Sequence, residues 1–204
     1  MKTIVIKEHT IVEDFLKDKE LHIIDLGACQ GEFSDAINQA YNLKRSILVE
    51  ANPTNFRKLP KLDNYVSLNR AVSSVANLVI PFKEDMNSPY NGSLVFDYFK
   101  DGRVHDIHTV TLKELISLMN VVQIDILNVD IEGSEYDLFK NVDDSDLLMF
   151  KQITVEFHDF VDPSYRALNL EIEKRLIGSG FNVLKNRIEY KYGSDYYDTL
   201  FYKV

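Results

Sequence analysis

The sequence predicts an α/β fold in which helices cover a mostly parallel sheet. Short apolar runs alternate along the chain with amphipathic segments of helical period, a pattern typical of parallel strands joined by right-handed helical crossovers. The 204 residues, of which 45% are hydrophobic, suffice for one domain with a substantial core. Since no linker or repeat divides the chain, we expect a single domain over residues 1–204, with residues 1–20 as an N-terminal strand and helix extension.

Apolar runs and capping signals place the elements. Strands are expected at residues 21–25, 46–50, 65–69, 77–82, 125–130, 152–157, 181–185 and 198–203, the last two as an antiparallel pair. Helices are expected at residues 10–16, 33–41, 53–60, 111–119, from 134, and 162–178. Thr111 and Glu114 have the spacing of a capping box. Residues 84–106 are expected to form loops and a hairpin.

Composition and charge narrow the classes of function. The net charge of −9 and the pI of about 5.0 disfavour a long duplex, so we expect no nucleic-acid partner. No apolar run approaches the roughly 20 residues that span a bilayer, and residues 1–8 are too short for a secretion signal, which favours a cytoplasmic protein without a membrane partner. Cys29 is the single cysteine, which excludes an internal disulfide.

A turn with two glycines follows the first buried strand. Asp25 ends that strand, Gly27 permits a tight turn, and Gly31 permits close approach at the next helix. Glu50 ends the second strand, where a carboxylate can accept hydrogen bonds from both hydroxyls of an adenosine ribose. Each feature alone is also compatible with a purely structural turn or a solvated acid. Together they favour a nucleotide-type cofactor.

The turn favours S-adenosylmethionine over a dinucleotide. A dinucleotide site places its pyrophosphate on the helix N-terminus and prefers Gly-x-Gly-x-x-Gly, whereas this chain has Cys29 in the turn. Glu32 follows the turn directly, and its charge would repel a phosphate but not a cationic sulfonium.

Acids and a histidine follow two later strands. Asp130 and Glu132 come at the end of the strand at 125–130, and Glu156 and His158 come at the end of the next. Because the carboxyl ends of parallel strands share one edge of a sheet, we expect these groups to converge over one pocket with the acids of the first two strands.

Several of these residues also have ordinary structural interpretations. Glu135 suits the dipole of a helix that begins beside it. His158 in isolation can equally be a loop histidine without a chemical role. His105 and His108 have a metal-ligand spacing, but they lie in an expected loop without a third ligand, so we do not favour a metal there.

Short motifs occur in order along most of the chain. They are Ile24–Ser34, Val49–Pro53, Asn69–Ser73, Gly92–Leu94, Thr111–Leu115 and, most distinctive, Val129–Glu135. With these motifs, from about Ile23 to Phe160, the chain resembles the FkbM-type methyltransferases. It departs from the family pattern at Cys29, Ala51, Lys113 and Asn128, where Asn, Pro, Asp and Lys are common in the family.

The resemblance implies the class I methyltransferase fold, a Rossmann-like three-layer sandwich with a seven-stranded, mostly parallel sheet and one antiparallel strand. It also implies methyl transfer from S-adenosylmethionine to a hydroxyl of a small-molecule or glycan acceptor, such as a sugar or natural product. The residues implied at the cofactor site are Asp25, Gly27, Ala28, Gly31 and Phe33 around the cofactor, Glu50 at the ribose, Ala51, Asn52, Ala71 and Val72 at the adenine, and Asp130 beside the reaction.

Catalysis is expected from Asp130, Glu132 and His158, since attack by an alcohol on the methyl carbon is helped by a general base. We expect His158 to be that base, with Asp130 as the second candidate. The same three residues could instead hold a divalent metal, which we do not favour. Two other classes remain open: a nucleotide-dependent oxidoreductase and a non-catalytic cofactor-binding module.

The acceptor is expected to lie against residues 84–106. This segment carries Tyr90, Phe96, Tyr98 and Phe99, which could stack on a sugar or a ring or could equally belong to the core.

Overall fold

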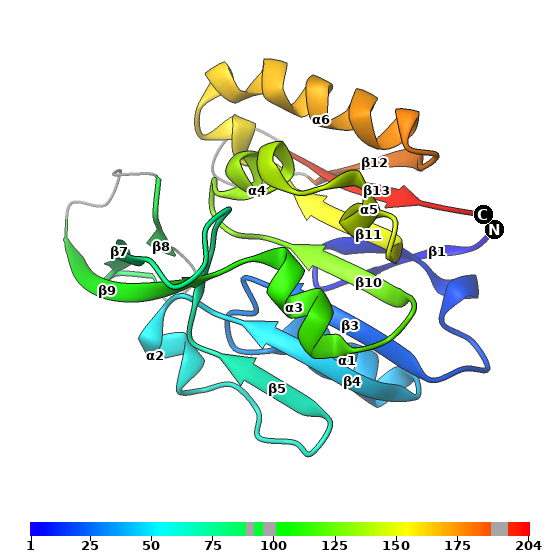
Figure 1. The fold of residues 1–204 in the computed structure, drawn as a ribbon, viewed down its shortest axis with the longest axis horizontal. Helices are drawn as coiled ribbons and strands as arrows, with labels where there is room; N and C mark the ends of the chain where they lie inside the picture. Colours follow the sequence, from blue (N-terminus) through cyan, green and yellow to red (C-terminus); the bar gives the residue numbers. More distant parts are fainter. Residues whose placement is uncertain (89–91, 96–100, 189–195) are drawn as a thin grey trace.

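A seven-stranded sheet forms the centre of the computed structural model, which describes residues 1–88, 92–95, 101–188 and 196–204 (Figure 1). Its order is β12-β13-β11-β10-β3-β4-β5. The strands are β3 (Leu21–Leu26), β4 (Leu43–Val49), β5 (Tyr65–Leu68), β10 (Ile124–Val129), β11 (Phe150–Glu156), β12 (Asn182–Ile188) and β13 (Tyr196–Tyr202). Neighbouring strands pair in parallel except at β13, which is antiparallel to both β11 and β12. This confirms the predicted sheet.

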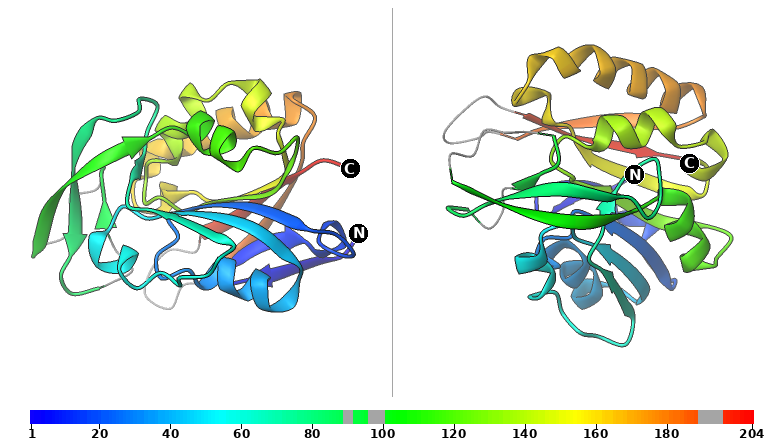
Figure 2. Two further views of the ribbon diagram at one scale, coloured as in Figure 1. Left: turned by 60° about the horizontal axis from the view of Figure 1, so that its bottom comes forward. Right: turned by 60° about the vertical axis from the view of Figure 1, so that its left-hand side comes forward.

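Helices cover both faces of the sheet, so the architecture has the three predicted layers (Figures 1 and 2). One face carries α1 (Glu32–Ala40) and α2 (Pro53–Phe56). The other carries α3 (Leu112–Met119), α4 (Glu135–Asn141), α5 (Asp144–Leu147) and α6 (Arg166–Gly178). Leu115, Phe139 and Leu176 bury the apolar stripes of α3, α4 and α6 against the strands.

The N-terminal segment forms a β-hairpin where the sequence analysis expected a helix at residues 10–16. Strands β1 (Thr3–Ile6) and β2 (His9–Val12) pair antiparallel, and the segment Glu13–Phe15 forms only a single 3₁₀ turn. The helical prediction was wrong because Thr10, Ile11 and Val12 are a β-branched run, which favours a strand. The hairpin packs on the same face as α1, with Ile11 in the core.

A second, smaller sheet lies beyond the carboxyl ends of the parallel strands (Figure 1). Its order is β6-β9-β7-β8, with β6 (Ala71–Val72), β7 (Val79–Asp85), β8 (Gly92–Ser93) and β9 (Gly102–Val110). The expected hairpin is therefore present, and β9 continues past the expected segment of residues 84–106 to Val110. Tyr90, Phe96, Tyr98 and Phe99 lie outside the described residues.

The predicted capping signals set the start of α3 but not that of α6. Thr111 and Glu114 form the capping box of α3. Asp162 caps a 3₁₀ turn at Pro163–Tyr165, and α6 begins only at Arg166. No helix in the described ranges is long and apolar enough to cross a membrane.

Candidate functional site

A cavity of about 810 Å³ opens at the carboxyl ends of β3, β4, β10 and β11, a size typical of cofactor and substrate sites. Most of the site residues predicted from the sequence line it. They are Asp25, Gly27, Ala28, Phe33, Glu50, Ala51, Asn52, Ala71, Val72, Asp130, Glu132 and His158. Gly31 is the predicted residue that does not line the cavity. The structure thus brings together residues from five separate segments of the chain.

The glycine turn is held tightly against two neighbouring strands. The amides of Gly27 and Ala28 both donate to the carbonyl of Val49, at 2.9 and 3.0 Å. Gly27 has a φ of +80°, and a Cβ there would lie 1.7 Å from the carbonyl oxygen of Asp130. A glycine is therefore required for the turn to pack against the end of β10.

Gly31 serves the helix rather than the cavity. It is the N-terminal capping position of α1 with a φ of +88°, and a Cβ there would meet the ring of Pro60 at 2.7 Å. Gly31 does not line the cavity, so its role is in the packing of α1 and not in the direct contact with the cofactor that the sequence predicted.

Asp25 is fully buried beneath the cavity and ties three elements together. Its carboxylate accepts hydrogen bonds from Ser34 of α1 at 2.7 Å and from Nδ2 of Asn128 of β10 at 3.0 Å. Burial raises its pKa, and the two hydrogen bonds oppose that rise. Asp25, the penultimate residue of β3, therefore positions the turn from below.

Glu50 follows the last residue of β4, and its two carboxylate oxygens accept hydrogen bonds from two segments, the glycine turn and the start of α2. Oε2 accepts from the amide of Cys29 and Oε1 from the amide of Asn52, each at 2.7 Å. Burial raises its pKa to about 8 despite these two hydrogen bonds. A carboxylate oxygen can accept more than one hydrogen bond, so Glu50 retains capacity for hydroxyl donors in the cavity.

A small apolar wall lies beside Glu50. Ala51, Ala71 and Val72 all line the cavity, and the last two are buried. Asn52 begins α2 by accepting a hydrogen bond from the amide of Thr54, which fixes the neighbouring backbone. The wall and the acid together form a surface suited to a flat ring attached to a diol.

His158 is held by a buried carboxylate. Nδ1 of His158 lies 3.1 Å from Oε1 of Glu135, and Glu135 is fully buried. Glu135 also accepts from the amides of Ile131 and Gly133, both at 3.0 Å. Glu135 lies in the first turn of α4 as expected, but its carboxylate points back to the preceding loop and orients the histidine.

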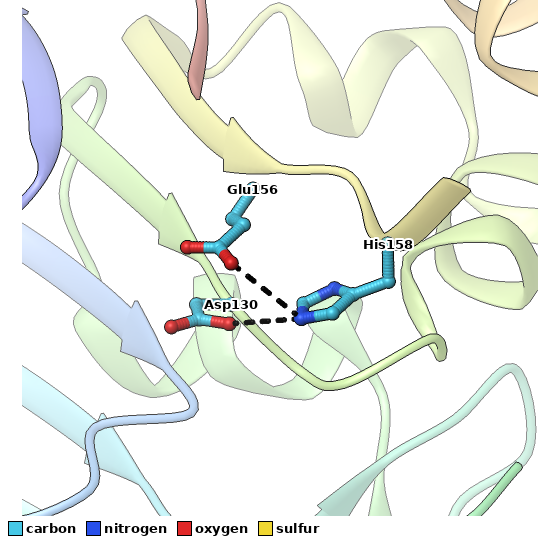
Figure 3. A group of neighbouring side chains, drawn as sticks. All are labelled: Asp130, Glu156 and His158. Atoms are coloured by element: carbon cyan, nitrogen blue, oxygen red, sulfur yellow. Dashed lines mark ion pairs between the residues drawn. The ribbon is translucent and has the colours of Figure 1, made fainter. Parts of the chain in front are cut away.

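Three carboxylates surround the other ring nitrogen of His158, and Figure 3 shows two of them, those of Asp130 and Glu156. Nε2 lies 3.5 Å from Glu132, 3.7 Å from Glu156 and 3.8 Å from Asp130. Burial by itself would lower the pKa of His158, but the neighbouring carboxylates, first of all Glu135, raise it well above its usual value. Burial also raises the pKa of Glu156 and of Asp130.

The geometry changes the set of residues that could hold a metal. One ligand atom each from Asp130, Glu156 and His158 lie within 4.8 Å of one another, so Glu156 takes the place that the sequence analysis gave to Glu132. His105 and His108 have the sequence spacing of metal ligands, but Nε2 of His105 contacts Oε2 of Glu84 at 2.7 Å.

Sequence reasoning missed His9 and left Glu135, Glu156 and Asn128 out of the predicted site. His9 lines the cavity from the N-terminal hairpin, and no local motif marks it. Asn128 could have been found from the sequence, because it lies two residues before Asp130 and near the end of a predicted strand. Glu156 was placed at the right edge of the sheet but given no role.

The sheet order and the cavity at its strand ends define a class I methyltransferase fold. A family model described as "Methyltransferase FkbM domain" matches residues 25–183. The chain therefore belongs to the FkbM methyltransferase domain family, as the sequence motifs indicated.

Solved structures share this fold at low sequence identity. A methyltransferase FkbM from Methylobacillus flagellatus KT is 14% identical with a TM-score of 0.56, over 92% of this chain and 45% of that chain. The present chain thus spans less than half of that relative. TrmK of M. capricolum, in complex with S-adenosyl-homocysteine, is 8% identical with a TM-score of 0.51, over 95% of this chain and 69% of that chain.

The METTL16 MTase domain is 9% identical with a TM-score of 0.55, over 93% of this chain and 64% of that chain. At these identities the likeness establishes the fold alone. No curated protein sequence gave a significant match to the chain.

Proposed function

We propose that the chain is an S-adenosylmethionine-dependent methyltransferase that methylates a hydroxyl of a sugar, glycan or natural product. The observation that supports this best is that one cavity contains both Glu50 and the His158 cluster. Glu50 and its apolar wall suit an adenosine. The cluster at the ends of β10 and β11 suits proton transfer next to it.

The buried polar atoms of the cavity fit a ligand of this kind. Asn128 lines the cavity, and its Oδ1 has no hydrogen-bond partner among the described residues. The amide orientation is fixed because Nδ2 donates to Asp25, so Oδ1 requires a donor from elsewhere. Oγ of Ser134, also on the cavity wall, likewise lacks a partner in the described chain.

The charge of the cavity favours a cationic cofactor over a dinucleotide. Among the described residues, the basic side chains on its wall are those of Lys7, His9, Arg70 and His158, and the acidic ones are more numerous: Glu8, Asp25, Glu32, Glu50, Asp130, Glu132 and Glu156. A pyrophosphate would be repelled by this surface, whereas a sulfonium would be attracted. The same charges disfavour an RNA acceptor, in line with the net charge of −9.

When bound, S-adenosylmethionine supplies a methyl group on a sulfonium, which is already a good leaving group. The protein's task is then to orient the acceptor hydroxyl, exclude water and accept a proton. His158 would accept the hydroxyl proton at Nε2, because Nδ1 is held by Glu135. Asp130 is the alternative acceptor of that proton, 3.8 Å from Nε2.

Labelled S-adenosylmethionine and a set of hydroxyl-bearing acceptors test this function. Transfer of label to the oxygen of any acceptor supports it. A rise in thermal stability with NAD but not with S-adenosylmethionine would instead select a nucleotide-dependent oxidoreductase. Cofactor affinity without turnover across a broad acceptor set would select a binding module.

A further inference from the structure

The turn of the N-terminal hairpin forms one wall of the cavity. Ile6 pairs with His9, so Lys7 and Glu8 form a two-residue turn, and both have positive φ, at 47° and 73°. Lys7, Glu8 and His9 all line the cavity. Asn-Gly is the usual sequence in such turns, because left-handed backbone is costly for larger side chains. The left-handed backbone of Lys7 and Glu8 is therefore energetically unfavourable, and this strained turn places a lysine at the cavity.

The hairpin is fastened to the central sheet, so this wall has a fixed position. All four residues of β2 are buried. The amide of Thr10 donates to Asp198 of β13, and the amide of Val12 donates to Gln152 of β11 at 2.7 Å. The hairpin is thus hydrogen-bonded to both strands of the antiparallel pair β11 and β13.

His9 brings a second positive charge to this wall. Its ring is 6% exposed and packs edge-on against Phe33, with ring centroids 5.4 Å apart. Nδ1 lies 3.6 Å from Oδ1 of Asp198. Burial would lower the pKa of His9, but Asp198, Asp130 and Glu156 raise it to about 9, so the ring is protonated at neutral pH. Nδ1 makes no hydrogen bond to the residues that the structure describes.

Arg70, the other permanent cation of the described cavity wall, follows β5, the strand at one edge of the central sheet. It donates to the carbonyl of Asn69. The hairpin contacts β11 and β13, toward the other side. A ligand carboxylate on the hairpin side would therefore meet Lys7 and His9, amid carboxylates that would otherwise repel it.

The expected orientation of the cofactor places its methionyl part near the hairpin wall formed by Lys7, Glu8 and His9. Glu50 at the end of β4 accepts the ribose, and the apolar wall for the adenine lies toward β5 and β6. The methionyl part then extends the opposite way, across β3 toward β10, β11 and the hairpin. We propose, on the basis of the function proposed above, that Lys7 and His9 bind the α-carboxylate of the methionyl group.

Two ligands that differ in this group test the proposal. S-adenosylhomocysteine carries the α-carboxylate, whereas 5′-methylthioadenosine has the same adenosine and a thioether without the amino-acid part. Calorimetry would give their dissociation constants for the full chain and for Lys7→Ala, Lys7→Arg and His9→Gln. Lys44→Ala is the matched control, because Lys44 is exposed, pairs with Glu20 and does not line the cavity.

We expect Lys7→Ala to weaken S-adenosylhomocysteine at least fivefold, to leave 5′-methylthioadenosine within twofold, and to be largely rescued by Lys7→Arg. His9→Gln is expected to act in the same direction, and circular dichroism verifies that it folds. Equal effects of Lys7→Ala on both ligands, or none on either, would overturn the proposal while leaving the methyltransferase function intact. Failure of the unmodified chain to bind either ligand would overturn both.

Discussion

Nδ1 of His158 lies 3.1 Å from Oε1 of Glu135, and this contact sets the direction of the imidazole ring. Glu135 is itself fixed by two backbone amides, those of Ile131 and Gly133. The ring therefore presents Nε2 to the carboxylates of the cavity. A histidine oriented through one nitrogen by a buried acid is well suited to accept a proton at the other.

His158→Ala is expected to lower turnover by about 100-fold or more, the usual contribution of a positioned general base. Affinity for S-adenosylhomocysteine should change little, because the adenosine is expected to lie at Glu50, away from this cluster. Steady-state kinetics and calorimetry on the same preparation separate the two effects. Turnover equal to that of the unmodified chain would remove His158 as the base.

The pH dependence of kcat/KM gives an independent test of the same residue. A base must be neutral to accept a proton, and the pKa of His158 is raised well above its usual value of 6.5. The rate should therefore rise with pH through a midpoint above 6.5 and level off only beyond it. Glu135→Gln removes the charge that raises the pKa most, so it should move the midpoint down. A midpoint unaffected by this variant would contradict the assignment.

Cofactor affinity should also depend on pH through Glu50, whose pKa is about 8 before binding. Ribose hydroxyls donate hydrogen bonds to the ionised carboxylate, so binding lowers this pKa and releases a proton at neutral pH. Affinity is then expected to rise with pH up to about 8 and to level off above it. Calorimetry in buffers of different ionisation enthalpy measures the released proton.

The variant Glu50→Gln provides the control for that measurement. The amino group of the cofactor titrates in the same range, and it does so equally with both proteins. The difference between the two pH profiles therefore reports Glu50 alone. Identical profiles would show that Glu50 does not change its protonation on binding.

Gly27→Ala is expected to destabilise the fold beyond the cost of its backbone conformation. Gly180 is the matched control, since its φ is +95° and a Cβ there would meet nothing within 4 Å. Gly180→Ala should cost about 1–2 kcal/mol of unfolding free energy for the left-handed conformation alone. Gly27→Ala should cost a further 1–3 kcal/mol or so, because the added Cβ overlaps the carbonyl of Asp130. Urea unfolding compares the two, and equal losses would contradict the packing account.

Turnover is expected to persist in the presence of a chelator. Asp130, Glu156 and His158 could supply three ligand atoms to a divalent ion, but the raised pKa of His158 favours a proton on its Nε2. Assays with EDTA and with added Mn²⁺ examine this directly. Loss of activity with EDTA, restoration by Mn²⁺, and loss of Mn²⁺ binding in Glu156→Gln would assign the cluster to a metal instead.

The strands of the central sheet were predictable because they depend on local signals, whereas the arrangement of seven mostly parallel strands was implied by the family resemblance. Apolar strands alternate with capped helices, and Gly27 and Gly31 mark the first turn. Asp25, Glu50, Asp130 and His158 could be placed at one edge because they end parallel strands. Periodicity and strand ends thus locate a site without any knowledge of tertiary contacts.

The remaining contacts depend on long-range packing that local signals do not contain. The amide of Thr10 reaches Asp198 across 188 positions of sequence, and that contact brings His9 to the cavity. Glu135 has the ordinary appearance of a first-turn acid, and its role is visible only when His158, 23 positions away, folds beside it. The chain order gives no indication of either pair.

Calorimetric titration of S-adenosylhomocysteine into the unmodified chain and into Glu50→Ala tests the central claim most directly. The account predicts saturable one-to-one binding to the unmodified chain. It predicts binding weaker by on the order of 10-fold or more in the variant, since a hydrogen bond to a charged group contributes about 1.5–3 kcal/mol. Absence of binding to the unmodified chain, or equal affinity in the two proteins, would contradict it.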